Sequence, residues 1–259
     1  MEPISLLDVR LFANEQLQNA KEFAGKIQFI QKSITNEGWT KEAGTIRASL
    51  WDDKELGDLQ VGDGISAWAS ILSVDLREST KLAHLVSPKE MYLAVHTLLP
   101  TLAFVCRKTG GKVMNFRGDG LLAAFGVKKI LGEDDQPETS QKEQANLSAV
   151  LAGYRLLESV ANAVQTVLAD DGISIDLHCG VGIDCGVVTL THVGWKSAKE
   201  LTAYGACVND ACHLSTGKDI VVVSENVVSR YPYSGDEGKL SFVPRENGFL
   251  ASCEIEALK

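Results

Sequence analysis

The sequence has 259 residues, a hydrophobic content of 45% and a formal net charge of −9 at pH 7. This length supports one domain of ordinary size with an extension, or two small domains, and the apolar content supports a substantial buried core. Lys and Arg form no basic stripe along the sequence. This excludes duplex nucleic acid as the main partner, because such binding depends on clustered positive charge.

The N-terminus, the apolar runs and the cysteines favour a cytoplasmic chain with no membrane partner. The first residues, MEPISLLDVRLF, lack the basic start and apolar run of a signal peptide. The longest apolar stretches, such as 65–74 and 121–127, are too short to span a bilayer. The six cysteines form no Cys-x-x-Cys pair, so we expect reduced, mostly buried thiols rather than a zinc site or a disulfide framework.

A helical N-terminal extension is expected first. Apolar residues recur at roughly helical spacing over 5–35, with charges between them. Residues 36–64 are rich in Gly and Asp and have weak periodicity, which indicates a connecting segment with one short strand at 45–50. We therefore divide the chain into residues 1–62, the helical extension and connecting segment, and residues 63–259, a single domain.

The next stretch predicts a strand, a helix and a hairpin. The apolar run 65–74 is typical of a buried strand, and a helix follows it up to the glycine pair 110–111. Two short strands at 112–116 and 121–125 flank Arg117-Gly118-Asp119-Gly120, which is a hairpin signal.

The second half of the chain begins with an acidic, polar loop at 132–144, which we expect to be a mobile surface segment. The remaining predicted elements are a helix at 145–169, strands at 173–183 and 186–193, a helix at 206–215, a strand at 219–224, and weak strands near 239–243 and 249–256. The order strand, helix, hairpin, helix, strand predicts an α+β fold of the ferredoxin-like β-α-β-β-α-β type, with an antiparallel sheet and helices on one face. Fold alone does not determine chemistry.

Two aspartates are candidate metal ligands. Asp75 ends the first core strand, and Asp119 lies at the tip of the hairpin, so a ferredoxin-like sheet would bring both carboxylates to one edge. Hard oxygen ligands of this kind suit Mg²⁺ or Mn²⁺, and two such ions can serve phosphoryl chemistry. Taken singly, Asp119 is explained by the turn preference for Asp-Gly and Asp75 by helix capping. Only the pair favours a metal site.

The residues after Asp75 are candidates for phosphate binding. Leu76-Arg77-Glu78-Ser79-Thr80 leads into a helix, whose first backbone N–H groups can bind phosphate. Ser79 and Thr80 are small enough to allow close approach. Arg77 either contacts the substrate or is a solvated surface residue.

With these residues in place, the sequence resembles the class III adenylyl and guanylyl cyclases over roughly residues 65–225. Four segments carry the resemblance, in the family's order and spacing: SVDLREST, GGKVMNFRGDGLLAAFG, CGVGIDCGVVTLTHVG and LTAYGACVNDACHLS. The resemblance implies a metal-dependent enzyme, with two ions per site on Asp75 and Asp119. It also implies a homodimer whose sites are shared, the aspartates coming from one subunit and the last helix from the other.

The same resemblance assigns catalytic residues and exposes a departure. Asn209 matches the family's Asn that orients the ribose. The family's transition-state Arg falls here on His213, so Arg77, Arg117 or a residue of the partner subunit could supply the missing charge. The family's late Lys, which holds the terminal phosphates, has no clear match here, and Arg245 is the candidate for it.

The base-binding positions also depart from the purine cyclases. They fall on Asn115 and Thr202, which are neutral and can both donate and accept hydrogen bonds. The sequence is also similar to bacterial pyrimidine cyclases of anti-phage defence, which implies a cyclic UMP or cyclic CMP product, with UTP favoured, that acts on a separate effector. The alternatives are a purine cyclase and a catalytically inactive homologue that only binds nucleotide or a partner.

Overall fold

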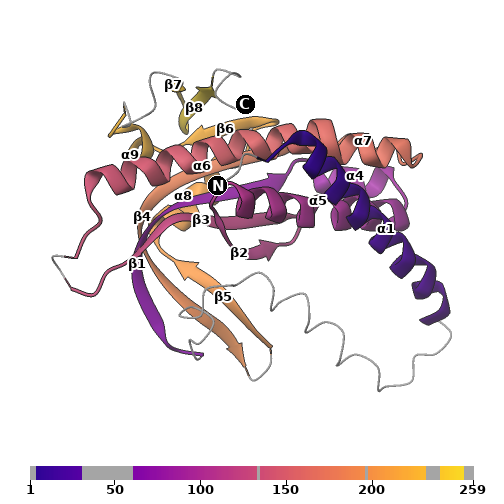
Figure 1. Ribbon diagram of the computed structural model, residues 1–259, viewed down its shortest axis with the longest axis horizontal. Coiled ribbons are helices and arrows are strands. Elements are labelled where there is room, and N and C mark those ends of the chain that lie inside the picture. Colours follow the sequence, from indigo (N-terminus) through magenta and orange to yellow (C-terminus); the bar gives the residue numbers. More distant parts are fainter. Residues whose placement is uncertain (1–3, 31–60, 133–134, 196–197, 232–239, 254–259) are drawn as a thin grey trace.

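One sheet, with helices on both of its faces, organises the chain (Figure 1). The computed structural model describes residues 4–30, 61–132, 135–195, 198–231 and 240–253. Its elements are α1 Leu6–Ile30, β1 Gly64–Leu76, α4 Ser79–Leu85, α5 Pro88–Lys108, β2 Lys112–Arg117, β3 Gly120–Lys129, α6 Thr139–Ser159, the π-helical turn η1 Val160–Val164, α7 Gln165–Asp170, β4 Cys179–Trp195, β5 Ala198–Tyr204, α8 Ala206–Leu214, β6 Ile220–Val223, α9 Glu225–Val228, β7 Leu240–Arg245 and β8 Gly248–Cys253.

The strand order confirms the predicted fold class. The sheet runs β2-β3-β1-β4-β6-β8-β7, with β5 paired to β4 outside this path. Its first four strands are antiparallel and have the ferredoxin-like order. Beyond them β6 pairs with β4 in parallel, and the β7–β8 hairpin extends the sheet through β8.

The alternation of side chains along β1 separates two apolar layers. Trp68, Leu72 and Val74 belong to the large core that also contains the buried residues of α5 and α6. Their neighbours Ala67, Ala69 and Ile71 belong to a second cluster on the other face, together with Cys207, Val208 and Ala211 of α8. The long helices therefore cover one face, as expected, and the short helix α8 covers part of the other.

Helix α1 packs onto this core. Val9, Ala13 and Leu17 are buried in the same cluster as the sheet, and the Phe12 ring stacks on the Phe104 ring of α5 with 4.3 Å between centroids. The connecting segment that follows α1, including the strand predicted at 45–50, lies outside the described residues. The N-terminal helix thus shares the hydrophobic core of the domain assigned to residues 63–259.

Two predicted strands were wrong in their bounds. The strands expected at 173–183 and 186–193 form the single long strand β4, and residues 173–178 lie outside regular structure. Sequence analysis did not predict β5, which pairs with β4. Its polar residues Lys199 and Glu200 make this segment less apolar than a typical strand. The end of β4 that pairs with β5 extends away from the helices together with the start of β1, as Figure 1 shows.

The predicted loop at 132–144 is shorter than expected, because α6 begins at Thr139. Glu138 caps this helix: its side chain accepts from the backbone of the first turn, and the Gln141 side chain accepts from the Glu138 N–H at 3.2 Å. The helix expected at 145–169 continues through η1 into α7 and ends at Asp170.

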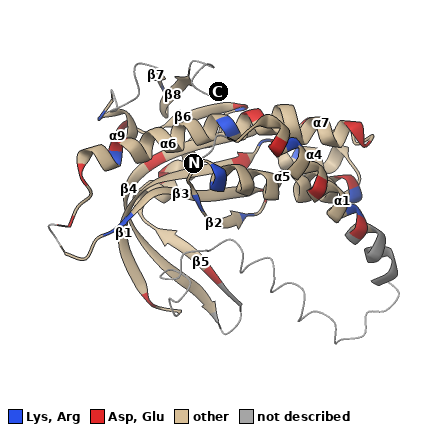
Figure 2. Ribbon diagram, viewed as in Figure 1, with Lys and Arg blue, Asp and Glu red and all other residues tan. Residues whose placement is uncertain are grey.

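The cysteines and the distribution of charged residues can be compared with the sequence. All six cysteines are free thiols, and four are buried. In Figure 2, Lys and Arg alternate with Asp and Glu along α1 and α6 instead of gathering on one of these helices. Within the described ranges, no helix combines the length and apolarity needed to cross a membrane.

Candidate active site

The pairing of β1 with β3 brings the two aspartates to one sheet edge. Asp75 is paired with Gly120, the residue that follows Asp119. A Cβ atom at position 120 would lie 2.7 Å from the Val74 carbonyl oxygen and 3.1 Å from Asp75 Oδ1, so only glycine fits there. This close approach places Asp119 beside Asp75, as the sequence predicts.

The hairpin geometry favours a functional role for Asp119 over a turn role. The loop residues are Gly118 and Asp119, and Gly118 takes the left-handed conformation with φ of 61°. Asp119 has no positive φ, so the turn does not require an aspartate there. Its Oδ2 atom is buried and has no hydrogen-bond partner. A buried, unpartnered carboxylate oxygen is costly and calls for a ligand.

Burial and the neighbouring carboxylate affect the ionisation of Asp75. Burial raises the pKa of Asp75, the negative charge of Asp119 raises it further, and Arg77 opposes both. Hard oxygen atoms held close together suit a divalent cation, which would relieve this repulsion. In the described part of the chain, no group of three or more His, Cys, Asp and Glu side chains is arranged to hold a metal ion. An ion on Asp75 and Asp119 would take its remaining ligands from substrate, water or main-chain oxygens.

Arg77 is held at this edge and is not a solvated surface residue. Its Nη1 atom donates to Asp75 Oδ2 at 2.8 Å and to the Ser215 carbonyl oxygen at 3.1 Å. Its backbone N–H donates to the His178 carbonyl oxygen at 2.8 Å. Sequence analysis did not identify Ser215, because a main-chain acceptor leaves no pattern in the sequence.

The segment after Asp75 has open backbone donors. Leu76 is buried as the last residue of β1, and Ser79 and Thr80 begin α4. Glu78 precedes them in the left-handed conformation, with φ of 56°, and no side chain caps the helix. The first N–H groups of α4 thus lack intrahelical partners and are available to an anion.

The predicted base-binding residues lie on two strands that contact each other, β2 and β5. Asn115 of β2 is 9% exposed, and its buried Oδ1 atom has no hydrogen-bond partner. Thr202 of β5 is partly exposed. Arg117 ends β2, and its Nη1 atom donates to Cys212 Sγ of α8 at 3.3 Å. Asn115 therefore combines burial with an unused acceptor, which suits a residue that binds a ligand.

Helix α8 is pressed against the sheet and turns its polar residues outward. Gly180 and Gly182 of β4 lie directly beneath it, where a Cβ atom would collide with the backbone of Ser215 or Ala211. Asn209 and His213 are one helical turn apart and exposed. The structure does not bring these two residues into contact with Asp75 or Asp119 of the same chain.

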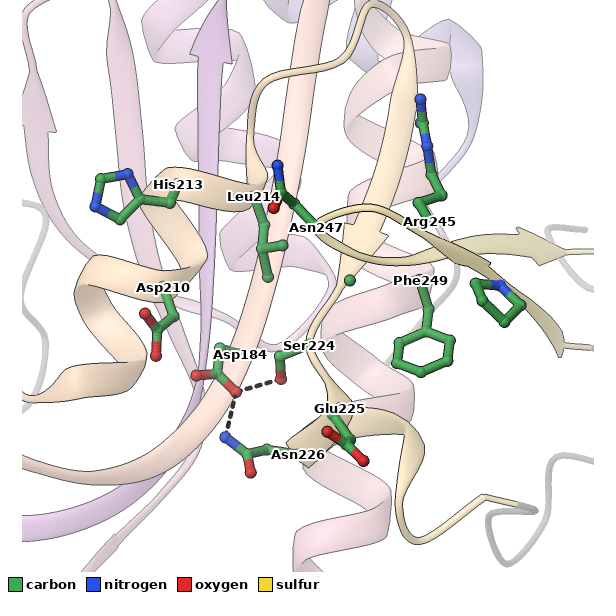
Figure 3. Close-up of a pocket in the computed structure, with 12 residues that line it drawn as sticks. Asp184, Asp210, His213, Leu214, Ser224, Glu225, Asn226, Arg245, Asn247 and Phe249 are labelled. Carbon is green, nitrogen blue, oxygen red and sulfur yellow. Dashed lines mark hydrogen bonds between the residues drawn. The ribbon is translucent and has the colours of Figure 1, made fainter.

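His213 lines a cavity of about 460 Å³ between α8, α9 and the β7–β8 hairpin (Figure 3). Arg245 lies on the same cavity, with its side chain extending away from Asp184. Asp184 of β4 is 1% exposed and accepts from Ser224 Oγ and from Asn226 Nδ2, the latter at 3.1 Å. Sequence analysis missed Asp184, although a single carboxylate inside an apolar strand is a visible signal.

Comparison with known proteins decides the family. A model of the adenylate and guanylate cyclase catalytic domain matches residues 66–247. This chain belongs to that class III cyclase family. The match covers both aspartates, Asn209 and the cavity residues up to Asn247.

Individual relatives agree with this assignment. A cytidylate cyclase of Escherichia coli is 27% identical over 173 residues, which cover 65% of this chain and 36% of that protein. The chain thus spans about a third of the length of this curated relative. The adenylyl cyclase CyaB of P. aeruginosa matches with a TM-score of 0.57 at 16% identity, covering 73% of this chain and 94% of that one. A dimeric guanylyl cyclase domain from the fungus Blastocladiella emersonii matches with a TM-score of 0.55 at 14% identity, covering 74% and 96%. Class III cyclases act on nucleoside triphosphates and use divalent metal ions.

Proposed function

We propose that this cyclase domain converts a pyrimidine nucleoside triphosphate into its 3′,5′-cyclic monophosphate and pyrophosphate, as a phosphorus–oxygen lyase. The observation that carries the proposal is the pair Asp75 and Asp119, adjacent at one sheet edge with a buried, unpartnered carboxylate oxygen. Two adjacent carboxylates without a bound cation lower the stability of the folded protein. A metal–triphosphate complex would bind to both of them.

The reaction is an in-line attack of the ribose 3′-hydroxyl on the α-phosphorus. Two Mg²⁺ or Mn²⁺ ions, when bound, supply the charge that favours ionisation of this hydroxyl and departure of pyrophosphate. Asp75 and Asp119 hold these ions, and the open N–H groups at the start of α4 bind phosphate oxygens. Asn209 orients the ribose. The chain needs no nucleophile of its own, because positioning and charge stabilisation account for the catalysis.

Cationic side chains must stabilise the transition state. His213 occupies the family's Arg position and can do so only when it is protonated. Arg77 and Arg117 lie at the same sheet edge as the two aspartates, and each already donates a hydrogen bond to a neighbouring side chain. Arg245 shares the cavity of His213, which supports its assignment to the terminal phosphates.

We propose that the active enzyme is a homodimer with two shared sites. The exposure of Asn209 and His213, away from the aspartates of their own chain, supports contribution of α8 to the site of the partner. The matched guanylyl cyclase domain of Blastocladiella emersonii is dimeric.

The base assignment rests on Asn115 and Thr202. An Asn amide both donates and accepts, so it can pair with the polar edge of uracil or cytosine. The similarity to defence-associated pyrimidine cyclases favours UTP, whereas the Escherichia coli relative is a cytidylate cyclase. The product would be a cytoplasmic second messenger that acts on a separate effector in antiviral defence. The free thiols of the chain suit that compartment.

To test this proposal, the protein is incubated separately with UTP, CTP, ATP and GTP in the presence of Mg²⁺ or Mn²⁺. The products are identified by mass spectrometry. Pyrimidine turnover should exceed purine turnover by several orders of magnitude, because a hydrogen-bonding site rejects a base that leaves its groups unpaired. Asp119→Ala is the inactive control. Cyclic AMP or cyclic GMP as the main product would refute the base assignment and leave the cyclase assignment standing.

A second candidate function is nucleotide binding without turnover. His213 in the position of the transition-state Arg is the observation that favours it. Tight binding of a triphosphate with no product from any of the four nucleotides, in either metal, would establish this alternative.

A further inference from the structure

The ion pair between Arg77 and Asp75 occupies an oxygen that the metal site needs. Arg77 Nη1 lies 2.8 Å from Asp75 Oδ2 and 3.1 Å from the Ser215 carbonyl oxygen. The Arg77 backbone is fixed by its bond to the His178 carbonyl oxygen, so only the long side chain is free to move. The Arg77 side chain is 25% exposed, which leaves it a path toward solvent and substrate.

A divalent ion and this guanidinium compete for the same carboxylate. Asp75 and Asp119 form an acidic pair, and the Arg77 guanidinium is bonded to one of its two carboxyl groups. An ion on Asp75 would face a positive charge a few ångströms away, and this repulsion weakens metal binding. In the absence of another anion, the resident ion pair therefore opposes the metal.

Triphosphate supplies the anion that resolves this competition. The guanidinium group binds phosphate oxygens through paired N–H donors at least as well as it binds a carboxylate. Another cation near this edge, Lys218, forms an ion pair with Glu78 instead of Asp75. Arg117 donates to Cys212. Arg77 is the cation that pairs with Asp75.

We infer that Arg77 exchanges partners during binding: it neutralises Asp75 in the nucleotide-free protein and moves to the phosphates when metal and substrate arrive together. This inference rests on the proposed function and adds an order to it. The metal ion alone binds weakly, and the metal–triphosphate complex binds strongly, because only the complex offers Arg77 a new partner. Arg77 then acts on the substrate as well as on its own metal ligand.

The experiment measures Mn²⁺ affinity by electron paramagnetic resonance, with Mn²⁺ alone and with Mn²⁺ plus inorganic tripolyphosphate. Arg77→Gln should bind Mn²⁺ alone more tightly, on the order of tenfold. An adjacent Arg lowers the affinity of a carboxylate for a proton by about that factor or more, and we expect a similar effect on a metal ion. The same variant should bind the Mn²⁺–tripolyphosphate complex more weakly, again on the order of tenfold. Two effects of opposite sign distinguish partner exchange from general damage to the site.

Matched variants complete the test. Lys218→Gln removes one positive charge from a side chain that pairs with Glu78 and not with Asp75, so Mn²⁺ affinity without tripolyphosphate should stay near wild type. Asp75→Asn should abolish Mn²⁺ binding. If Arg77→Gln fails to fold by circular dichroism, the same titrations on Arg77→Met replace it. Met also removes the charge and the paired donors while keeping an unbranched side chain, so both shifts should keep their signs.

The inference is overturned if Arg77→Gln lowers the affinity both for Mn²⁺ alone and for the Mn²⁺–tripolyphosphate complex. It is also overturned if this variant leaves the affinity for Mn²⁺ alone unchanged, or if the wild-type protein binds no Mn²⁺ under either condition. Its failure is separable from failure of the proposed function. Tripolyphosphate has no base or ribose, so the exchange can be observed in a protein that forms no cyclic nucleotide. Conversely, a protein that forms cyclic nucleotide can show no exchange.

Discussion

Asp119 is expected to lower the stability of the folded protein, although the protein needs it for activity. Its Oδ2 atom is buried without a partner, beside the negative charge of Asp75. Asp119→Asn removes the charge while keeping the shape, so it should raise the free energy of unfolding by about 1 kcal/mol. Turnover should be abolished. Thermal unfolding and product formation, measured on the same preparation, check both halves; a lower melting temperature would show that Asp119 supports the fold.

The raised pKa of Asp75 makes a prediction for acidic pH. Burial and then Asp119 stabilise the protonated form, whereas a bound cation requires the ionised form. Metal binding and turnover should therefore decline on acidification at a higher pH than an ordinary aspartate would impose. The pH profile of Mn²⁺ affinity measures this, and a decline only at the ordinary aspartate pKa would contradict it.

The same shift fixes the sign of a stability effect in the metal-free protein. A carboxyl whose pKa is raised on folding contributes stability below its unfolded pKa, and that contribution is lost as the pH rises through the folded pKa. Asp75→Asn should therefore be more stable than wild type at neutral pH, and the difference should shrink in acid. Denaturant unfolding at the two pH values provides the comparison.

The two metal ligands could be predicted at the residue scale, and the contacts of Arg77 could not. Asp75 follows a buried strand and Asp119 lies in a hairpin, so chain order and the pairing of β1 with β3 are enough to bring them together. The position of Arg77 depends on the Ser215 carbonyl oxygen, and a main-chain atom has no residue type by which to recognise it.

At the scale of elements, one predicted break between strands was wrong. The strands expected at 173–183 and 186–193 form the single strand β4, which runs through Asp184 and Cys185 without interruption. Gly182 of this strand marks a close approach of α8 instead of a turn. The glycine pair 110–111 and the hairpin glycines did mark real ends of elements. The sequence shows where glycine occurs, whereas only the packing distinguishes a turn from a close approach.

The contact between α8 and β4 predicts different outcomes for two glycines of one strand. At Gly182 a methyl group would collide with the Ala211 carbonyl oxygen, whereas at Gly186 it would lie 3.5 Å from Cys207, an ordinary contact. Gly182→Ala should displace α8, lower stability by about 1–3 kcal/mol and abolish turnover. Gly186→Ala should retain most of both. Melting temperatures and rates of the two variants test this, and equal behaviour would count against the packing described.

At the scale of the whole molecule, α1 is expected to be part of the domain. Leu17 is fully buried in the core shared with the sheet, whereas Leu11 on the same helix is 61% exposed. Leu17→Ala should cost about 2–5 kcal/mol. Leu11→Ala should cost less than about 0.5 kcal/mol. Chemical denaturation of both variants is the measurement, and equal effects would show that α1 folds apart from the cyclase domain.

The shared-site dimer predicts complementation between inactive variants. Asp119→Ala and Asn209→Ala should each be nearly inactive as homodimers, but a mixed dimer places both lesions in one site and leaves the other intact. With random exchange about half of the dimers are mixed, so about a quarter of wild-type activity should return. If mixing restores nothing, although labelled subunits are shown to exchange, Asn209 does not act across the interface.

The use of main-chain atoms around Arg77 affects how the site tolerates genetic change. The carbonyl groups of His178 and Ser215 accept from Arg77 whatever side chains these positions carry. Drift at 178, or replacement of Ser215 by another small residue, leaves both acceptors in place. Codon 77 has no such redundancy, because no other side chain provides the same donors. A saturation library selected for cyclic nucleotide production should therefore retain diversity at 178 and small-residue diversity at 215, and should lose it at 75, 77 and 119.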